Sequence, residues 1–413
     1  MYFTEMRLHH LNIITKDIVT AKKKLSILYG FRYYGFIQHS KRDVILVLIQ
    51  NNIFLTITGK PDVSVDTIDD IAFCVDSVHQ CCEDVVAYGG TVLESCHLIN
   101  CENKNNSTFK TDKQQCACKT LQCGNYVKKA VIKSPVGNIR HSIYEKTNFC
   151  GDFLPGFVRT SAEATYASQA GFDNIDHIAL AVPCNEATQH IDWYKHCMKM
   201  LRFKTNSQES LSGLVIHAKH GNGVRLLTLV EHPCSNMAIS ESNDKEVEVR
   251  NGQVKFVFCE SLIDEGSDQI QTFLRQHGGA GVQHVAFNTK KILSDAQSWI
   301  DRGVNFIKPP PAYYKEISST LDKLKSKYDI VHLRKNGILI DAEKLIGDTS
   351  QKEGYLYQVF TEPVFDSKTF FFELIQREQA RGFGEGNISA LWRALDAHVK
   401  SNELEDCKDF SPI

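Results

Sequence analysis

Residues 281–289 read Gly-Val-Gln-His-Val-Ala-Phe-Asn-Thr, and they follow a turn signal formed by Gly278 and Gly279. Apolar residues then alternate along the stretch, which is the pattern of a short β-strand rather than of a helix. His284 lies near the start of this strand, where the hydrogen bonds of a sheet would fix its position. A single histidine on a strand is more often a packed or surface residue than a ligand, so the stretch becomes informative only through its recurrence.

The same plan occurs four times along the chain: a short strand, a polar break, an amphipathic helix and a turn into another strand. The opening strands are expected at residues 8–14, 68–75, 175–182 and 282–287, and the helices at 18–28, 78–88, 187–201 and 292–302. Further strand-like runs lie between the repeats, so each module reads β-α-β-β-β. We therefore expect an α+β fold of four tandem βαβββ modules that form two open-barrel halves, followed by a C-terminal helix at 388–400.

Two halves of ordinary domain size suit a chain of 413 residues. We expect one domain at 1–150 and a second, catalytic domain at 169–400. The residues 151–168 are expected to form the linker between them, because they contain the turn-forming sequence Phe-Leu-Pro-Gly-Phe at 153–157.

The composition excludes several classes of protein. The hydrophobic fraction of 42% and charged fraction of 23% are those of a globular protein, and no run is apolar enough to span a membrane. The net charge of −2 gives no basic surface for nucleic acid. The first 28 residues carry neither a secretory core nor a typical transit peptide, so the 14 cysteines are expected to be reduced thiols. A zinc site in the cysteine-rich insertion between Cys101 and Cys123 is a weaker alternative, because its spacing is unusual.

Aligning the four opening strands places His10, Asp70, His177 and His284 at equivalent positions. When two modules pair, their first strands meet at the centre of a shared cup, and these side chains point into it. The C-terminal half therefore brings His177 and His284 together. The N-terminal half offers only His10 and Asp70, and we expect it to bind no metal.

The expected third ligand is Glu373, which lies in an apolar run, because an unpaired buried carboxylate is costly and a cation removes that cost. A pair with Arg377, or a solvent-facing position, is the alternative. Two histidines and one carboxylate leave three adjacent positions free on an octahedral metal, which is typical of Fe(II) and oxygen chemistry. Zinc could use the same ligands, although the chain lacks the His-Glu-x-x-His helix of zinc peptidases.

Five sequence runs carry a family resemblance, and it is dense from about residue 173 to about residue 396. They are Gln-Ile-Gln at 269–271 through Gly-Gly-Ala-Gly-Val-Gln-His at 278–284, Pro-Pro-Pro-Ala-Tyr-Tyr at 309–314, Tyr-Leu-Tyr-Gln-Val-Phe-Thr at 355–361, Phe-Glu-Leu-Ile-Gln-Arg at 372–377 and Gly-Phe-Gly-Glu-Gly-Asn at 382–387. These runs resemble the 4-hydroxyphenylpyruvate dioxygenase family, whose N-terminal half is a non-catalytic vicinal-oxygen-chelate domain.

The resemblance implies a site and its partners. It implies one Fe(II) per chain, bound by His177, His284 and Glu373, with a small aromatic α-keto acid and O2 as the reactants. It also implies a pocket in which Phe360 and Phe383 sandwich the substrate's ring. The remaining pocket residues that it implies are Gln269, Gln283, Gln358, Thr228, Asn387 and Ile388. A homodimer is a further expectation, and the resemblance favours the mitochondrion as the compartment, with the cytoplasm as the alternative.

Departures from the family's pattern bear on the product. A pocket Ser and Asn become Gly213 and Thr228, and Ile388 stands where the family usually has Phe. In this the chain is more similar to an animal branch associated with making 4-hydroxymandelate, a precursor of the quinone head group. We therefore expect oxidative decarboxylation of 4-hydroxyphenylpyruvate with attack on the benzylic carbon, giving 4-hydroxymandelate. Attack on the ring, giving homogentisate as in tyrosine catabolism, is the alternative.

Three further alternatives remain open from the sequence. An isomerase or an extradiol ring-cleaving enzyme would keep the fold, and metal content and oxygen consumption distinguish these from the expected reaction. A catalytically inactive binding module is a different class, which the retention of all three ligands disfavours.

The C-terminal helix at 388–400 would either close over the cup as a gate, excluding water, or be an ordinary packed helix.

Overall fold

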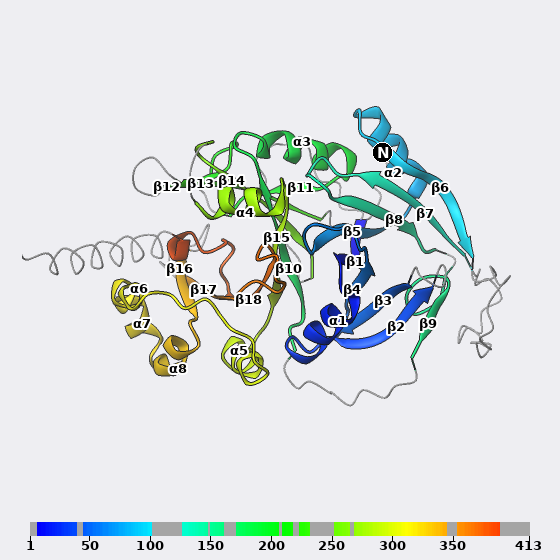
Figure 1. Cartoon of the computed structure of the whole chain (residues 1–413). Helices are drawn as coiled ribbons and strands as arrows, with labels where there is room; N and C mark the ends of the chain where they lie inside the picture. Colours follow the sequence, from blue (N-terminus) through cyan, green and yellow to red (C-terminus); the bar gives the residue numbers. More distant parts are fainter. Residues whose placement is uncertain are drawn as a thin grey trace, which may run out of the picture.

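Two nine-stranded sheets, each with few helices, form the protein (Figure 1). This computed structural model describes residues 6–38, 44–100, 126–147, 149–160, 171–205, 209–217, 223–231, 252–264, 268–344 and 353–388. The first sheet is coloured blue to teal in Figure 1, and the second lies beside it in green to red. The predicted α+β architecture is confirmed.

The first sheet has the strand order β6-β7-β8-β5-β1-β4-β3-β2-β9. Its elements in chain order are β1 (Met6–Thr15), α1 (Ile18–Ile27), β2 (Arg32–Gln38), β3 (Val44–Gln50), β4 (Ile53–Gly59), β5 (Thr67–Val75), α2 (Val78–Ala87), β6 (Val92–Asn100), β7 (Tyr126–Lys133), β8 (Arg140–Glu145) and β9 (Phe157–Arg159).

The second sheet has the order β11-β13-β14-β10-β15-β18-β17-β16, with β12 paired to β13. Its elements are β10 (Asn174–Val182), α3 (Ala187–Cys197), β11 (Leu201–Phe203), β12 (Leu214–His217), β13 (Gly223–Val230), β14 (Lys255–Ser261), α4 (Gln269–His277), β15 (Gly281–Asn288), α5 (Ile292–Asp301), α6 (Pro311–Glu316), α7 (Ser318–Leu324), α8 (Ile330–Lys335), β16 (Leu339–Lys344), β17 (Glu353–Phe360) and β18 (Phe371–Glu378).

The pairing of strands repeats in the two sheets. The opening strands of two modules run antiparallel at each centre, as β1 with β5 and as β10 with β15. Each opening strand also has a parallel neighbour from the end of its own module: β4, β8, β14 or β18. This is the arrangement predicted from the four-fold sequence repeat, and it places the aligned residues of the opening strands at the centre of each sheet.

Local sequence signals set several helix ends. Asp17, Asp268 and Asp329 each accept hydrogen bonds from two backbone N–H groups of the first turn, at α1, α4 and α8. Helix α4 ends at Gly278, whose φ of +81° is left-handed, and the N–H groups of Gly278 and Gly279 both donate to the carbonyl of Leu274. The glycine turn before β15 therefore reverses the chain directly into the strand that carries His284.

Two features lie outside the simple repeat. Helices α6, α7 and α8 are inserted between α5 and β16, and they lie at the end of the molecule away from the first sheet (Figure 1). Strand β9 lies within the expected linker 151–168 and pairs with β2, so the first sheet reaches past residue 150. The division into domains at 1–150 and 169–400 stays a prediction.

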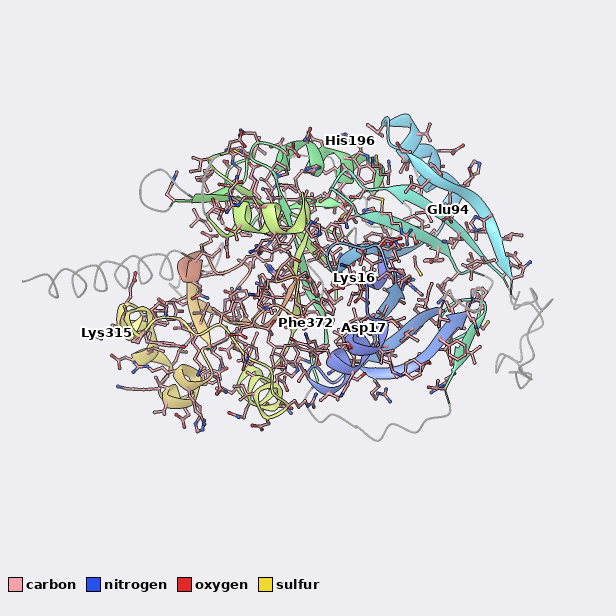
Figure 2. The ribbon with its side chains drawn as sticks, viewed as in Figure 1. Lys16, Asp17, Glu94, His196, Lys315 and Phe372 are labelled. Atoms are coloured by element: carbon pink, nitrogen blue, oxygen red, sulfur yellow. The ribbon has the colours of Figure 1, made fainter. Side chains whose placement is uncertain are left out.

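An aromatic cluster joins the two halves. Phe372 of β18 lies near the middle of the molecule (Figure 2), with its ring centroid 4.9 Å from that of Tyr29 and 5.0 Å from that of Phe287. Phe31 of the first half is 5.9 Å from Phe287. One buried core contains all four rings and continues into both halves. The strands that carry the candidate ligands are therefore anchored from behind by apolar packing, which is costly to disturb.

The described cysteines differ in their state. Cys150 is disulfide-bonded, which contradicts the expectation of reduced thiols at this position. The cysteines with free thiols are Cys74, Cys81, Cys82, Cys96, Cys184, Cys197 and Cys259. In the part of the chain that the structure describes, no helix is both long and apolar enough to cross a membrane.

Glu231 makes a polar link between the halves. It follows β13 and is buried, and its two carboxyl oxygens accept hydrogen bonds from the N–H of Leu8 (2.7 Å) and the N–H of Val254 (3.0 Å). Burial raises the pKa of Glu231 from 4.5 to about 7, against the two hydrogen bonds and the nearby cations of Arg7 and Lys255. The native state therefore favours the protonated carboxyl at mildly acidic pH.

Glu231→Gln should change how stability depends on pH. Because the folded pKa of Glu231 lies above the unfolded value of 4.5, its contribution is fully present below about pH 4.5 and is lost as the pH rises through about 7. Between these limits, the wild type should lose about 2–3 kcal/mol of unfolding free energy relative to the variant. Urea titrations of both proteins at pH 4.5 and pH 8 measure this difference. An equal change with pH in both proteins would contradict the assignment.

Candidate metal centre

Three neighbouring strands bring His177, His284 and Glu373 together. In the antiparallel pair of β10 and β15, His177 lies opposite Ala286 and Ala179 lies opposite His284. In the parallel pair of β15 and β18, Glu373 lies level with Ala286. His177 and Glu373 therefore flank Ala286, and His284 lies two residues before it on the same face of β15. The three side chains project from adjacent strands, as the alignment of the repeats predicts for the two histidines.

The ligand atoms of these residues are close enough to share one ion. His177 Nε2 and His284 Nε2 are 3.3 Å apart, and they lie 3.3 Å and 3.4 Å from Glu373 Oε2. Two ligands bound at right angles, each about 2.1 Å from a metal, lie about 3.0 Å apart. The observed separations are thus close to those of a facial triad, and among the described residues this is the group that could hold a metal ion.

The carboxylate of Glu373 has one satisfied oxygen and one unsatisfied oxygen. Its side chain has 0% exposure, and Oε1 accepts a hydrogen bond of 2.9 Å from Gln358 Nε2. Oε2 has no hydrogen-bond partner among the described residues, although it is buried. A buried oxygen without a partner is costly, and a cation between it and the two imidazoles removes that cost. These residues therefore fit a divalent metal.

The carboxylate and one imidazole are in the forms that bind a cation. Burial opposes ionisation of Glu373, but the neighbouring His177 and His284 hold its pKa down at about 2. Burial also opposes a charged His177, yet Glu373 and Asp176 together raise its pKa. Burial lowers the pKa of His284. Near neutral pH the site therefore offers an ionised carboxylate and at least one neutral imidazole.

Arg377 does not pair with Glu373, which was the alternative considered from the sequence. Its Nε and Nη2 donate to the two oxygens of Asp176, each at 2.8 Å. Burial opposes ionisation of Asp176, but Arg377 and Lys255 hold its pKa well below its usual range. The charge of Arg377 is thus balanced by Asp176, and Glu373 Oε2 remains directed at the histidines.

β-Bulges turn the residue before each histidine toward the site. The register of β10 and β15 shifts between Ile175 and His177, and again at the step from His284 to Val282. The bulged residues are therefore Asp176 and Gln283. A bulge places its extra residue out of the regular alternation, so Gln283 Oε1 comes within 3.2 Å of His284 Nδ1. Strict alternation would have turned Gln283 away.

Gln358 links the carboxylate to the segment that follows β18. Its Oε1 accepts a hydrogen bond of 2.8 Å from Asn387 Nδ2, and Asn387 Oδ1 accepts one of 2.7 Å from the Tyr313 hydroxyl. The chain Tyr313–Asn387–Gln358–Glu373 is buried throughout. Gln358 and Asn387, both expected in the pocket, therefore act on the carboxylate in this structure.

Aromatic rings lie against both histidines. The Phe383 ring centroid is 5.0 Å from that of His177, and the Phe360 centroid is 6.1 Å from that of His284. Phe371 stacks on His284 at 4.8 Å. Phe383 thus lies beside one histidine and Phe360 beside the other, and Phe371 is an additional neighbour of His284. That Phe383 and Phe360 flank the ring of a substrate stays a prediction.

Thr228 and Ile388 belong to the apolar side of the site. Thr228 is buried on β13 between Leu226 and Val230, whose side chains share its face of the strand. Leu226 and Val230 pack in one cluster with Phe383, and Ile388 packs against that cluster. Gly213 approaches the same strand so closely that an added Cβ would lie 2.6 Å from the Leu226 carbonyl oxygen.

Two expectations about the site, the pocket role of Gln269 and the gating helix, stay predictions. Gln269 is the first residue of α4 and its side chain is exposed, whereas Gln271 is buried and donates to the Ile263 carbonyl. Any pocket role of Gln269 stays a prediction. The proposed gating helix at 388–400 lies outside the described residues beyond Ile388.

The equivalent place in the first sheet is built differently. Its register, with Asp70 level with Arg140 and Phe73 level with Ile143, puts Ser142 where the second sheet has Glu373. Asp70 accepts hydrogen bonds from the N–H and the hydroxyl of Ser142, at 2.9 Å and 2.6 Å. Burial raises the pKa of Asp70 to about 6. Ser142 thus hydrogen-bonds both carboxyl oxygens of Asp70, and it stands at the position where a third ligand would have to lie.

His10, the counterpart of His177, lies within a cluster of imidazole and aromatic rings. Its Nδ1 lies 2.7 Å from Nδ1 of His9, and its ring centroid is 5.2 Å from that of Phe153. Burial and the nearby cation of Lys146 lower the pKa of His10 to about 3. Among the described residues, the first sheet offers no group of three metal ligands.

The chain is similar to curated proteins along much of its length. It is 30% identical over 268 residues to the 4-hydroxyphenylpyruvate dioxygenase-like protein of Mus musculus, and this match covers 64% of the chain and 65% of the relative. The chain thus spans less than two thirds of that relative. It is 27% identical over 387 residues to 4-hydroxyphenylpyruvate dioxygenase of Dictyostelium discoideum, covering 89% of the chain and 91% of the relative. No protein-family model matches the chain.

A solved structure shares the fold. A mutant of 4-hydroxymandelate synthase from Streptomyces coelicolor superimposes with a TM-score of 0.70 and covers 96% of this chain and 99% of that one. The sequence identity is 22%. At this identity the likeness shows a common architecture and does not distinguish between reactions.

Gly384→Ala should displace Gln358 from the carboxylate. Gly384 has a φ of +80°, and an added Cβ would lie 2.0 Å from Gln358 Oε1. Gly278→Ala is the matched control, because Gly278 has a φ of +81° but an added Cβ there would meet nothing within 4 Å. Both variants should lose about 1 kcal/mol to backbone strain, and Gly384→Ala about 2 kcal/mol more through the broken buried hydrogen bonds. Urea unfolding measures both, and equal losses would contradict this arrangement.

Proposed function

The chain belongs to the 4-hydroxyphenylpyruvate dioxygenase family, and from this premise we propose that it is an Fe(II)-dependent dioxygenase. Its substrates are 4-hydroxyphenylpyruvate and O2, and it binds one iron per chain through His177, His284 and Glu373. The observation that carries the proposal is the unpartnered, buried Oε2 of Glu373 beside two imidazole nitrogens. A site that had lost its function would have little reason to keep this costly arrangement.

The residues of the chain have distinct tasks in this proposal. Bound Fe(II) supplies the Lewis acid and the electrons for chemistry with O2. Gln358 holds Glu373 Oε1, which leaves Oε2 directed at the metal position. Phe360 and Phe383 flank the aromatic ring of the substrate. The apolar cluster around Phe383 and Ile388 excludes water from the reacting atoms.

The favoured product is 4-hydroxymandelate, a precursor of the quinone head group. Both possible reactions join one O2 to the keto acid and release one CO2. They differ in the carbon that receives the second oxygen atom, and attack on the ring also requires the side chain to migrate to a neighbouring ring carbon. Ile388 and Thr228 decide this by where they let the ring lie, since both border the cluster that contains Phe383. A branched aliphatic side chain in place of a phenyl ring gives the substrate ring more room at this wall, which favours attack on the benzylic carbon.

The direct test measures O2 uptake and product together. Iron-loaded protein should consume one O2 and release one CO2 per 4-hydroxyphenylpyruvate, and give 4-hydroxymandelate as the main product by chromatography. Glu373→Ala should lose at least about 100-fold in rate, because the triad loses its anionic ligand. Glu260→Gln, which removes another buried Arg-paired carboxylate in the same sheet, should retain activity. Homogentisate as the sole product would overturn the assignment of 4-hydroxymandelate as the product. The absence of O2 uptake would overturn the proposal that the protein is a dioxygenase.

Ile388→Phe should shift the product toward homogentisate. The larger ring would narrow the pocket beside Phe383 and move the substrate's ring toward the metal position. We expect the ratio of homogentisate to 4-hydroxymandelate to rise by about tenfold, which corresponds to about 1.4 kcal/mol between the two barriers. Ile388→Leu is the control of similar volume. An unchanged ratio in Ile388→Phe would contradict the role given to this residue.

Other functions make different predictions in the same assay. An isomerase on this scaffold would convert its substrate without O2, and an extradiol enzyme would open a catechol ring. A binding module without turnover would bind the keto acid but leave O2 unchanged. The homodimer and the mitochondrial compartment rest on the family resemblance alone and stay predictions.

A further inference from the structure

We infer that Asp176, held by Arg377 and Lys255, is a positioning residue that fixes the ring of His177 for metal binding. The inference deepens the proposed function and rests on it, because it concerns the same metal centre. It assigns a task to a buried ionic cluster that no sequence pattern singled out.

The position of Asp176 depends on the β-bulge of β10. The register passes from Ile175 opposite Phe287 to His177 opposite Ala286, which leaves Asp176 without a partner in the ladder. Asp176 is therefore free of the strict alternation that would point it away from its neighbour. As a result its Oδ1 lies 2.9 Å from Nδ1 of His177, and its side chain is buried.

Asp176 is itself held by donors from two other strands. Arg377 of β18 donates from Nη2 to Oδ1 and from Nε to Oδ2, each at 2.8 Å. Lys255 of β14 donates from Nζ to Oδ2 at 3.2 Å. The carboxylate therefore has a fixed orientation, because a two-pronged arginine contact allows little rotation.

A fixed carboxylate determines which nitrogen of His177 faces the metal. When Nδ1–H donates to Asp176, the lone pair of the ring is on Nε2, which lies 3.3 Å from Glu373 Oε2 and 3.3 Å from His284 Nε2. Partners of this kind fix the tautomer and orientation of metal-binding histidines and increase their basicity as ligands. Asp176 therefore prepares His177 before a metal arrives.

Arg377 connects this support to the wall of the pocket. Its Nη1 donates to the carbonyl oxygens of Ala380 at 3.4 Å and Gly382 at 2.6 Å. Its guanidinium carbon also lies 5.2 Å from the Phe383 ring centroid. One cation thus fixes both the partner of His177 and the loop that carries Phe383.

The two histidines are supported unequally. The bulge of β15 gives His284 a neutral partner, Gln283, at the longer distance of 3.2 Å. The partner of His177 is a carboxylate that accepts three further hydrogen bonds from two cationic side chains. Loss of Asp176 should therefore weaken metal binding more than loss of Gln283.

A matched control lies in the same sheet. Glu260 of β14 accepts a hydrogen bond of 2.7 Å from Arg225 and one of 2.9 Å from the N–H of Ala187, and its side chain is 1% exposed. It is thus a buried, arginine-paired carboxylate like Asp176. Its described hydrogen-bond partners do not include a residue of the triad.

The test measures Co(II) binding by the full chain in the absence of O2. Asp176→Ala should weaken the affinity roughly 10- to 100-fold, and Asp176→Asn less, because an amide oxygen can still accept from Nδ1–H. The visible absorption bands of bound Co(II) should shift in both variants. Glu260→Gln and Glu260→Ala should bind Co(II) within about twofold of the wild type at a comparable loss of stability.

Each outcome decides one of the two claims. If the wild type does not bind Co(II), or Glu373→Ala binds it equally well, the metal centre of the proposed function fails. If the wild type binds and Asp176→Ala binds as tightly, or Glu260→Ala weakens binding as much as Asp176→Ala does, only the positioning role is overturned. If Asp176→Ala does not fold, Arg377→Lys decides, since it keeps the charge but loses the two-pronged contact. Unchanged affinity and spectrum in Arg377→Lys would then overturn the inference.

Discussion

The rest of the site depends on one constraint: the carboxylate of Glu373 is fully buried, and one of its oxygens has no hydrogen-bond donor among the described residues. Glu373 lies between two imidazoles that cannot donate to it as neutral rings, because a neutral ring has one N–H and Nδ1 of each ring faces an oxygen acceptor, Asp176 Oδ1 or Gln283 Oε1. Burying an ionised carboxylate costs several kcal/mol unless a cation compensates it. The surrounding residues are arranged around this requirement: Gln358 satisfies one oxygen, and Arg377 is neutralised by Asp176 and so leaves the other oxygen unpaired.

Among the described residues, the duplicated fold explains why a group of three ligands forms in one half and not in the other. Both sheets join two modules through antiparallel opening strands, and both bring two aligned side chains to the centre. In the first sheet, Ser142 replaces the third ligand and bonds to Asp70, while His10 packs against Phe153. The scaffold supplies the meeting point, and the residues placed there decide whether it can hold a metal: the first sheet has Asp70 and Ser142 where the second has His284 and Glu373.

The sequence predicted the two sheets and the meeting of His177 and His284, because a four-fold repeat reveals equivalent positions even without structure. Glu373 was predicted as their neighbour because its carboxylate lies in an apolar run. The sequence did not reveal Asp176 as the partner of His177, since strict alternation turns a preceding residue away and a β-bulge leaves no readable signal. The inserted helices α6 to α8 and the strand β9 lie outside the repeat and were also missed. Gln269 was expected in the pocket by resemblance, but its position at the first turn of α4 leaves it exposed.

Anomalous X-ray diffraction from crystals of the protein grown with Fe(II) in the absence of O2 tests the central claim most directly. We expect one iron peak per chain, about 2.0–2.2 Å from His177 Nε2, His284 Nε2 and Glu373 Oε2. The peak should be lost in Glu373→Ala and retained in Glu260→Gln. An iron peak at other residues, or none at the triad when iron is in excess, would contradict the assignment of a metal centre.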